Sequence, residues 1–226
     1  MKNTVIVEFN GLPGLGKTTV ANAVIGELKN QGYTILDKSY KRGPFGGIVH
    51  YCPWLFNRSL YKHVLSFANS IPPERRKRTH VNWTNSYAYK YKTIVKHSNA
   101  DFAIVDEAII QFLVAMAFQD KMPVTDKADA IVKKLKSIGI IFTRVDCIND
   151  VEEAAKRIMT RPSRGLVFES MQHEELLRTL EVEAANFDYL HSVFSKVYEN
   201  QKVITIDTIH NCPKDNAQII IDQIMG

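Results

Sequence analysis

A chain of 226 residues with 45% hydrophobic and 23% charged side chains has an ordinary globular composition, and its length fits one α/β domain. The net charge of +5 suits an anionic ligand such as a nucleotide, and it also suits nucleic acid. Only residues 75–78 form a basic run, while the other basic residues are scattered among acids, which argues against a general polyanion binder.

Three widely separated cysteines without a CxxC pair argue against a disulfide framework and against a zinc site. The first residues are too few for a signal peptide, and no apolar run approaches the roughly 20 residues that cross a bilayer. We therefore expect a soluble, cytoplasmic protein without a membrane partner.

Five short apolar runs rich in β-branched residues predict buried strands. These runs cover residues 5–9, 33–36, 102–105, 139–145 and 203–206. Helical spacing of apolar residues predicts helices between them, at 18–29, 151–160, 169–197 and 215–225, with a largely helical region at about 53–98. Apolar strands that alternate with helices indicate a parallel sheet covered on both faces. We predict one three-layer α/β domain over residues 1–226, with a parallel sheet of about five strands.

The loop after the first strand matches G-x-x-x-x-G-K-S/T at every fixed position, and it lies between a strand and a helix as that motif requires. Glycines bring backbone N–H groups close to phosphate oxygens, and the helix N-terminus adds its positive dipole end. We expect Lys17 to reach the β- and γ-phosphates and the Thr18 hydroxyl to ligate Mg²⁺. The expected nucleotide-binding residues are Gly11, Leu12, Pro13, Gly14, Leu15, Gly16, Lys17, Thr18 and Thr19. The sequence therefore predicts a P-loop that binds ATP with Mg²⁺.

Two carboxylates follow the third predicted strand directly. We expect Asp106 to bind the Mg²⁺ ion together with Thr18, directly or through water. We expect Glu107 to face either the molecule that accepts a phosphoryl group or a catalytic water. The alternative is that Asp106 only caps a helix beginning at Glu107.

Three arginines follow the fourth predicted strand. Arg157 and Arg161 share one helix face, and Arg164 lies just beyond Pro162, where the helix breaks. Over a triphosphate, they would offset the charge on the transferring phosphoryl group and exclude water. We expect an arginine-bearing lid at about residues 157–168, with a solvated helix face as the alternative.

The pattern E-E-A-x-x-R-I-x-x-R at residues 152–161 resembles the lid of the P-loop nucleoside and nucleotide kinases, among them thymidylate and deoxynucleoside kinases. The last strand, Asp207 and the terminal helix are similar to the end of that family, and the resemblance places residues 210–213 beside the adenine. Glu107 stands where those kinases usually carry an arginine, and Pro13 where thymidylate kinases carry an acid. The resemblance implies a kinase that transfers the γ-phosphate of ATP to a nucleoside, nucleotide or similar small acceptor.

The acceptor side is expected in the region 53–98 and at Asp37, which ends the second strand where ligands bind in such sheets. Asp37 is a candidate for orienting the attacking hydroxyl or taking its proton, with a turn-forming role as the alternative. The run at 75–78 either reads an acceptor phosphate or begins a solvated helix. One helix face predicts either a wall for a flat base or part of the core, and it carries Trp83, Tyr87, Tyr91 and Ile94.

Two functions other than a kinase remain possible: a GTP-dependent switch and an ATPase or ATP-binding module. Residues 143–146 approximate the guanine-reading N/T-K-x-D motif of GTP-dependent switches, although Arg144 replaces the lysine. The second alternative function is an ATPase or ATP-binding module that acts on nucleic acid or protein. Against it, the sequence shows no nucleic-acid module, further domain or second ATPase signature.

Overall fold

The computed structural model describes residues 4–36, 52, 55–70, 78–106, 108–118, 127–163 and 168–226. Its strands form one five-stranded, all-parallel sheet in the order β2-β3-β1-β4-β5. The bounds are β1 Val5–Asn10, β2 Ile35–Leu36, β3 Phe102–Val105, β4 Thr143–Cys147 and β5 Val203–Ile206. This sheet confirms the predicted α/β class, and it places β1 at the centre.

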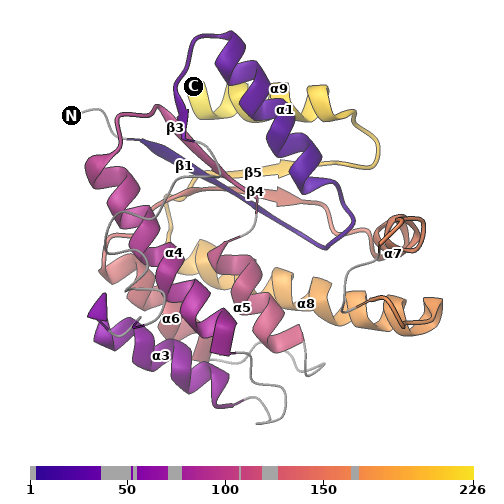
Figure 1. Ribbon diagram of the computed structural model, residues 1–226, viewed down its shortest axis with the longest axis horizontal. Coiled ribbons are helices and arrows are strands. Elements are labelled where there is room, and N and C mark those ends of the chain that lie inside the picture. The colour runs from indigo at the N-terminus through magenta and orange to yellow at the C-terminus, as the bar shows by residue number, and fades with distance from the viewer. Residues whose placement is uncertain are drawn as a thin grey trace.

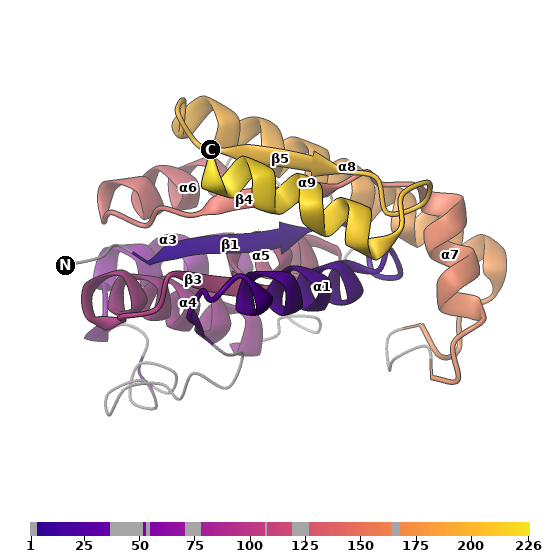
Figure 2. The same cartoon turned by 90° about the horizontal axis from the view of Figure 1, so that it is seen from above.

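Helices cover both faces of the sheet, as predicted (Figures 1 and 2). Helices α1 and α9 pack together on one face, while α4, α5 and α8 lie on the other, with α3 and α6 outside them. Helix α7 lies at the end where the strands finish, and it packs on α8. The bounds are α1 Lys17–Asn30, α3 Arg58–Ala68, α4 Arg78–His97, α5 Ile109–Phe118, α6 Lys127–Ser137, α7 Val151–Met159, α8 His173–Val197 and α9 Pro213–Met225. Within the described ranges, no helix combines the length and apolar character needed to span a membrane.

The central strand explains how the layers hold together. Its Val7 and Phe9 side chains are fully buried, and so is Glu8, which points to the opposite face because strand side chains alternate. Helix α1 meets the sheet with buried residues at helical spacing, among them Val20, Val24 and Leu28. One hydrophobic core thus runs through the sheet and both helical layers.

The fourth strand begins later than the sequence predicts, at Thr143 instead of residue 139. Gly139 adopts a positive φ of 76° directly after α6, and the amide of Ile140 bonds back to the carbonyl of Leu135. This glycine turn ends the helix, so the apolar residues after it lead into the sheet without pairing in it. Ile140 is buried, whereas Ile141 is 71% exposed. Helix α8 similarly begins at His173, four residues after the predicted start.

The two adjacent isoleucines give a test of this boundary. Replacing Ile140 by alanine should lower the free energy of unfolding by about 2–4 kcal/mol, because it leaves a cavity in the core. Replacing Ile141 should change it by less than about 0.5 kcal/mol. Urea unfolding of both variants measures the difference, and equal losses would show that both side chains are buried.

Candidate active site

The glycine-rich loop joins β1 to α1 at the end of the sheet where the strands finish (Figure 1). Gly11 and Gly14 have positive φ values of 138° and 95°. A Cβ atom on Gly11 would lie 2.9 Å from Cβ of Cys147, and one on Gly14 would lie 2.8 Å from the carbonyl oxygen of Ala154. Any other residue would therefore clash at these two positions, because the loop packs tightly against β4 and α7.

Lys17 lies inside the curve of this loop. Its ammonium donates to the carbonyl oxygens of Gly11 at 2.7 Å and Leu12 at 2.9 Å, and the residue is 6% exposed. The amide of Leu12 in turn donates to Oδ1 of Asn149 at 3.1 Å. Asn149 is a loop-supporting residue that the sequence analysis missed, and its position just after β4 is the only signal that points to it.

Thr18 and Asp106 lie together, as the sequence predicts for two Mg²⁺-side residues. The Thr18 hydroxyl donates to Oδ2 of Asp106 at 2.9 Å, across a sequence separation of 88 residues. Helix α5 begins at Ile109, so Asp106 comes too early to be its N-cap, contrary to the capping alternative. A hydroxyl and a carboxylate are hard oxygen donors of the kind that Mg²⁺ prefers. Glu107 lies outside the described residues.

Arg157 connects the helix of the predicted lid with two other parts of the site. Its Nε donates to Oε1 of Glu153 at 2.7 Å, and Nη2 donates to the carbonyl of Thr208 at 3.3 Å. Its Nη1 lies 3.8 Å from the place that a Cβ on Gly16 would occupy, so the guanidinium borders the P-loop. Hydrogen bonding to Arg157 holds the pKa of Glu153 below its usual range.

Of the other two predicted lid arginines, the structure describes Arg161 but not Arg164. Arg161 is exposed just past the end of α7. Arg164 lies outside the described residues, so the predicted lid is described only at 157–163 and at residue 168.

A pocket beside the P-loop is formed by the segment between β5 and α9. Its lining includes Leu15, Gly16, Thr19, Val20, Arg157, Thr208, Ile209, Asn211, Pro213 and Asn216. Two residues of the predicted base-side loop, Asn211 and Pro213, therefore share a pocket with the P-loop residues Leu15 and Gly16. Asp207 organises this loop by accepting from the amides of Ile209 and His210 and pairing with the His210 ring at 2.7 Å. These hydrogen bonds, above all those from His210, lower the pKa of Asp207 to about 2.

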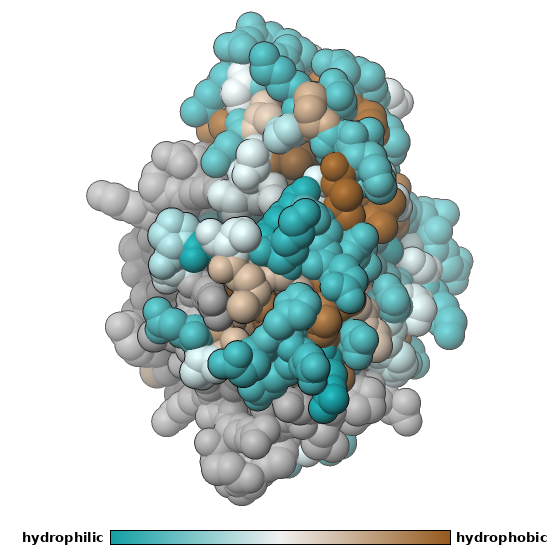
Figure 3. Space-filling model, turned by 90° about the vertical axis from the view of Figure 1, so that its right-hand side faces the viewer, coloured by the Kyte–Doolittle hydropathy of each residue, from teal (hydrophilic) through white to brown (hydrophobic). Residues whose placement is uncertain are grey.

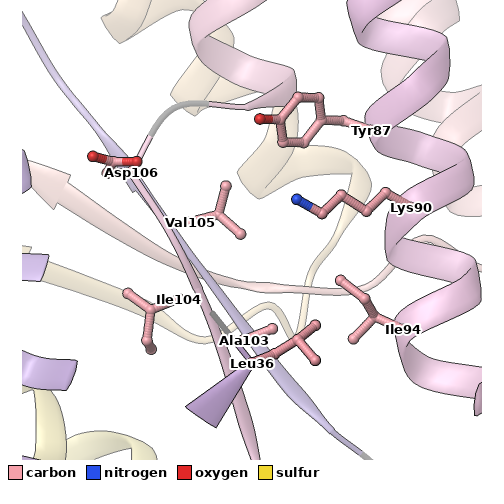
Figure 4. Close-up of a pocket in the computed structure, with 8 residues that line it drawn as sticks. All are labelled: Leu36, Tyr87, Lys90, Ile94, Ala103, Ile104, Val105 and Asp106. Atoms are coloured by element: carbon pink, nitrogen blue, oxygen red, sulfur yellow. The ribbon is translucent and has the colours of Figure 1, made fainter. Parts of the chain in front are cut away.

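A second pocket lies between α4 and the ends of β2 and β3 (Figure 4). It is lined by Leu36, Tyr87, Lys90, Ile94, Ala103, Ile104, Val105 and Asp106. Lys90 extends from α4 toward the β3 wall, and its ammonium lies 5.2 Å from the centre of the Tyr87 ring. The pocket therefore shares Asp106 with the P-loop side of the site. Lys90 was not predicted, since one lysine on a helix carries no signal in a sequence.

The aromatic face of α4 is divided between the pocket and the core. Tyr87 and Ile94 line the pocket, although Ile94 is also fully buried in the core. Tyr91 is fully buried and does not line the pocket, and Trp83 packs on Phe112 with ring centres 5.1 Å apart. Asp37, which was predicted to serve the acceptor, lies outside the described residues, as do residues 75–77 of the basic run.

The end of the molecule that carries these groups is shown in Figure 3, where hydrophilic side chains gather over the middle of the surface. Hydrophobic side chains lie between and beside them.

Glu8 is a buried carboxylate beneath the P-loop, in the strand that leads into it. Oε2 accepts from the Tyr91 hydroxyl at 2.6 Å, and Oε1 accepts from the amide of Ile110 at 3.0 Å. Burial raises the pKa of Glu8 from 4.5 to about 7, although these hydrogen bonds favour the ionised form. The sequence analysis read this residue only as part of an apolar strand.

Arg144 and Asp146, the residues of the possible guanine motif, are turned into the protein. Arg144 Nε pairs with Oδ2 of Asp146 at 2.8 Å, and its guanidinium also reaches α8 at the carbonyl of His191 and the hydroxyl of Ser195. Both residues are buried. Because both side chains are buried and hydrogen-bonded within the protein, the structure argues against a guanine-reading role.

The central strand, the strand order and the glycine-rich loop define a P-loop fold. Three solved structures of deoxyadenosine kinase from M. mycoides share it, with TM-scores of 0.53, 0.54 and 0.53 and sequence identities of 15%, 14% and 13%. The matches cover 98% of this chain and 99–100% of each kinase chain. Those structures contain dATP, the products dCMP and dCDP, and dCTP, respectively. The resemblance to nucleoside kinases is thus confirmed at the level of the fold.

No protein-family model and no curated protein matches the sequence.

The buried Glu8 predicts a pH dependence of stability. Because its folded pKa of about 7 exceeds its ordinary value of 4.5, the folded state binds more protons than the unfolded state between these values. The contribution of Glu8 to the free energy of unfolding is therefore fully present below about pH 4.5 and falls, on the order of 1–3 kcal/mol, as the pH rises through 7.

The measurement is urea unfolding of the wild type and Glu8→Gln from pH 4.5 to 8. The wild type should lose stability relative to Glu8→Gln as the pH rises, since the amide does not titrate. His191 titrates in both proteins and should cancel in the difference, whereas Asp146 repels the Glu8 carboxylate and contributes to the rise in its pKa. A difference that is flat or grows with pH would contradict the raised pKa.

Proposed function

We propose that this protein is an ATP- and Mg²⁺-dependent phosphotransferase that moves the γ-phosphate to a nucleoside or nucleotide. The observation that carries the proposal is the 2.9 Å hydrogen bond between Thr18 of the P-loop and Asp106 at the end of β3. It joins the two groups that a P-loop kinase needs at its metal, next to Lys17 in the same loop. A deoxynucleoside is the first acceptor to test, since structures of the same fold contain deoxynucleotides.

On the donor side, the backbone amides of the loop and Lys17 would bind the β- and γ-phosphates. Thr18 and Asp106 would hold Mg²⁺, which when bound offsets the negative charge of these phosphates. Arg157 borders the loop at Gly16, where it would offset charge on the transferring group together with Arg161 and Arg164. The base would lie in the pocket lined by Asn211 and Pro213.

On the acceptor side, the pocket between α4 and β3 lies beside Asp106, as in-line transfer requires. Its walls combine the apolar side chains of Ile94 and Val105 with the phenol of Tyr87 and the ammonium of Lys90. This mixture suits the flat base and the hydroxyl groups of a nucleoside. Asp37 and Glu107 are the proposed candidates for orienting the attacking hydroxyl and accepting its proton.

A cytoplasmic location is part of the proposal. Cys52, Cys147 and Cys212 are all free thiols, which agrees with a reducing compartment where ATP is also available.

The first test measures ADP formation with Mg²⁺-ATP across a panel of nucleosides, deoxynucleosides and their monophosphates. Wild-type turnover should depend on one class of acceptor. Lys17→Ala should lower kcat by roughly 10²–10³-fold because a positive charge at the transferring phosphate is lost. Lys29→Ala, on an exposed turn of the same helix, is the matched control and should behave as the wild type.

Full turnover in folded Lys17→Ala would refute the mechanism. ATP hydrolysis that is indifferent to every acceptor would instead favour an ATPase that acts on a macromolecule.

A second test separates the effect of the Thr18 hydroxyl group from the effect of the shape of the Thr18 side chain. Thr18→Val should raise the Mg²⁺ concentration for half-maximal activity roughly tenfold or more, while Thr18→Ser, which keeps the hydroxyl, should stay close to the wild type. Magnesium titrations of the three proteins give the answer. Equal Mg²⁺ dependence of the valine and serine variants would exclude Thr18 as a ligand.

A further inference from the structure

Glu8 bonds to two helices with its two carboxylate oxygens, although it lies fully buried in the middle of the sheet. Oε2 accepts from Tyr91 of α4 at 2.6 Å, and Oε1 accepts from Ile110 in the first turn of α5 at 3.0 Å. A hydrogen bond in the protein interior is electrostatically stronger than one in water, because the local dielectric is low. One side chain, three residues before Gly11, therefore fixes two helices to the strand that becomes the P-loop.

Through its hydrogen bond to Tyr91, Glu8 is connected to α4, which forms one wall of the acceptor-side pocket. The Tyr91 ring meets Tyr87 edge to face, with ring centres 6.3 Å apart, and Lys90 lies over the Tyr87 ring. Tyr87, Lys90 and Ile94 all line the pocket, whereas Tyr91 stands behind them in the core. The position of this wall relative to the sheet therefore depends on what holds Tyr91.

The contact with Ile110 leads to the opposite wall. Ile110 follows Asp106 by four residues, and Asp106 with the preceding β3 residues forms that side of the pocket (Figure 4). Glu8 is also the β-sheet partner of Val105, a residue of this second wall. Glu8 therefore lies beside Val105, on the strand next to the β3 side of the pocket.

We propose that Glu8 is a positioning residue that sets both walls of the acceptor pocket relative to the P-loop, acting through Tyr91 on one side and Ile110 on the other. It touches neither substrate in the proposed reaction. This inference rests on the proposed function, because it concerns how the acceptor is held for transfer. Its consequence is that loss of the Glu8–Tyr91 bond impairs use of the acceptor and spares ATP.

The test compares Tyr91→Phe with Tyr198→Phe. Tyr198 is a matched control because it is also a buried tyrosine whose hydroxyl makes one hydrogen bond, at 2.9 Å to the carbonyl of Ile140. That bond lies before the start of β4, at the opposite end of the sheet from the site. Tyr91→Phe should raise the KM for the acceptor about tenfold, with the KM for ATP changed less than about twofold. Tyr198→Phe should leave both values near those of the wild type.

Glu8→Gln provides the conservative variant. Its amide oxygen still accepts from Ile110, and its NH₂ group donates to the Tyr91 oxygen, so both connections survive. The KM for the acceptor should stay within about threefold of the wild type. A KM as high as that of Tyr91→Phe would contradict positioning through hydrogen bonds.

Hydrogen exchange of the backbone amides provides a readout that needs no activity. Tyr91→Phe should speed exchange in α4 between residues 87 and 94, and Tyr198→Phe should not. Failure of the wild type to phosphorylate any acceptor would refute the proposed function but leave this comparison intact. The inference itself is overturned if Tyr91→Phe matches Tyr198→Phe in acceptor KM, or in α4 exchange.

Discussion

The pairing of β1 with both β3 and β4 is the interaction on which the rest of the structure depends. Parallel strands end at the same edge of a sheet, so this pairing brings Gly11, Asp106 and Asn149 together there. The Thr18–Asp106 and Leu12–Asn149 hydrogen bonds span 88 and 137 residues, and both follow from it. The loop glycines Gly11 and Gly14 then pack closely against β4 and α7.

Charged groups buried under the sheet show a second constraint. A buried charge is costly unless it is paired, and apolar side chains of similar size are often at least as stabilising. Here Arg144 pairs with Asp146, whose pKa burial raises to about 6, and burial with the nearby guanidinium lowers the pKa of His191 to about 3. His191 is therefore neutral near pH 7. Together with Glu8, these groups bond α4, α5 and α8 to the sheet.

The parts of the structure that were predictable from sequence are those that a local pattern encodes. The P-loop is contiguous, β3 is an apolar run closed by Asp106, and α7 begins at a capping Asp150 that accepts from the amide of Glu153. Contacts between distant segments had no such pattern. Glu8 looks like one polar residue in an apolar strand, and only the fold brings it to Tyr91, 83 residues later. Spacing alone likewise could not divide the α4 aromatics between pocket and core.

The two cations beside the P-loop are already held by oxygen atoms of the protein. Lys17 donates to two loop carbonyls, and Arg157 is fixed by Glu153 and the carbonyl of Thr208. In the proposed reaction, a triphosphate would replace the carbonyl partners of Lys17 while Arg157 keeps its Glu153 bond, because a guanidinium has five N–H donors. Little side-chain ordering would then remain for binding, so the phosphates would meet charges that are already in place. In the proposed reaction, the donor half of the site would therefore be preorganised by contacts around the P-loop, whereas the acceptor half would depend on how the helices are held to β1.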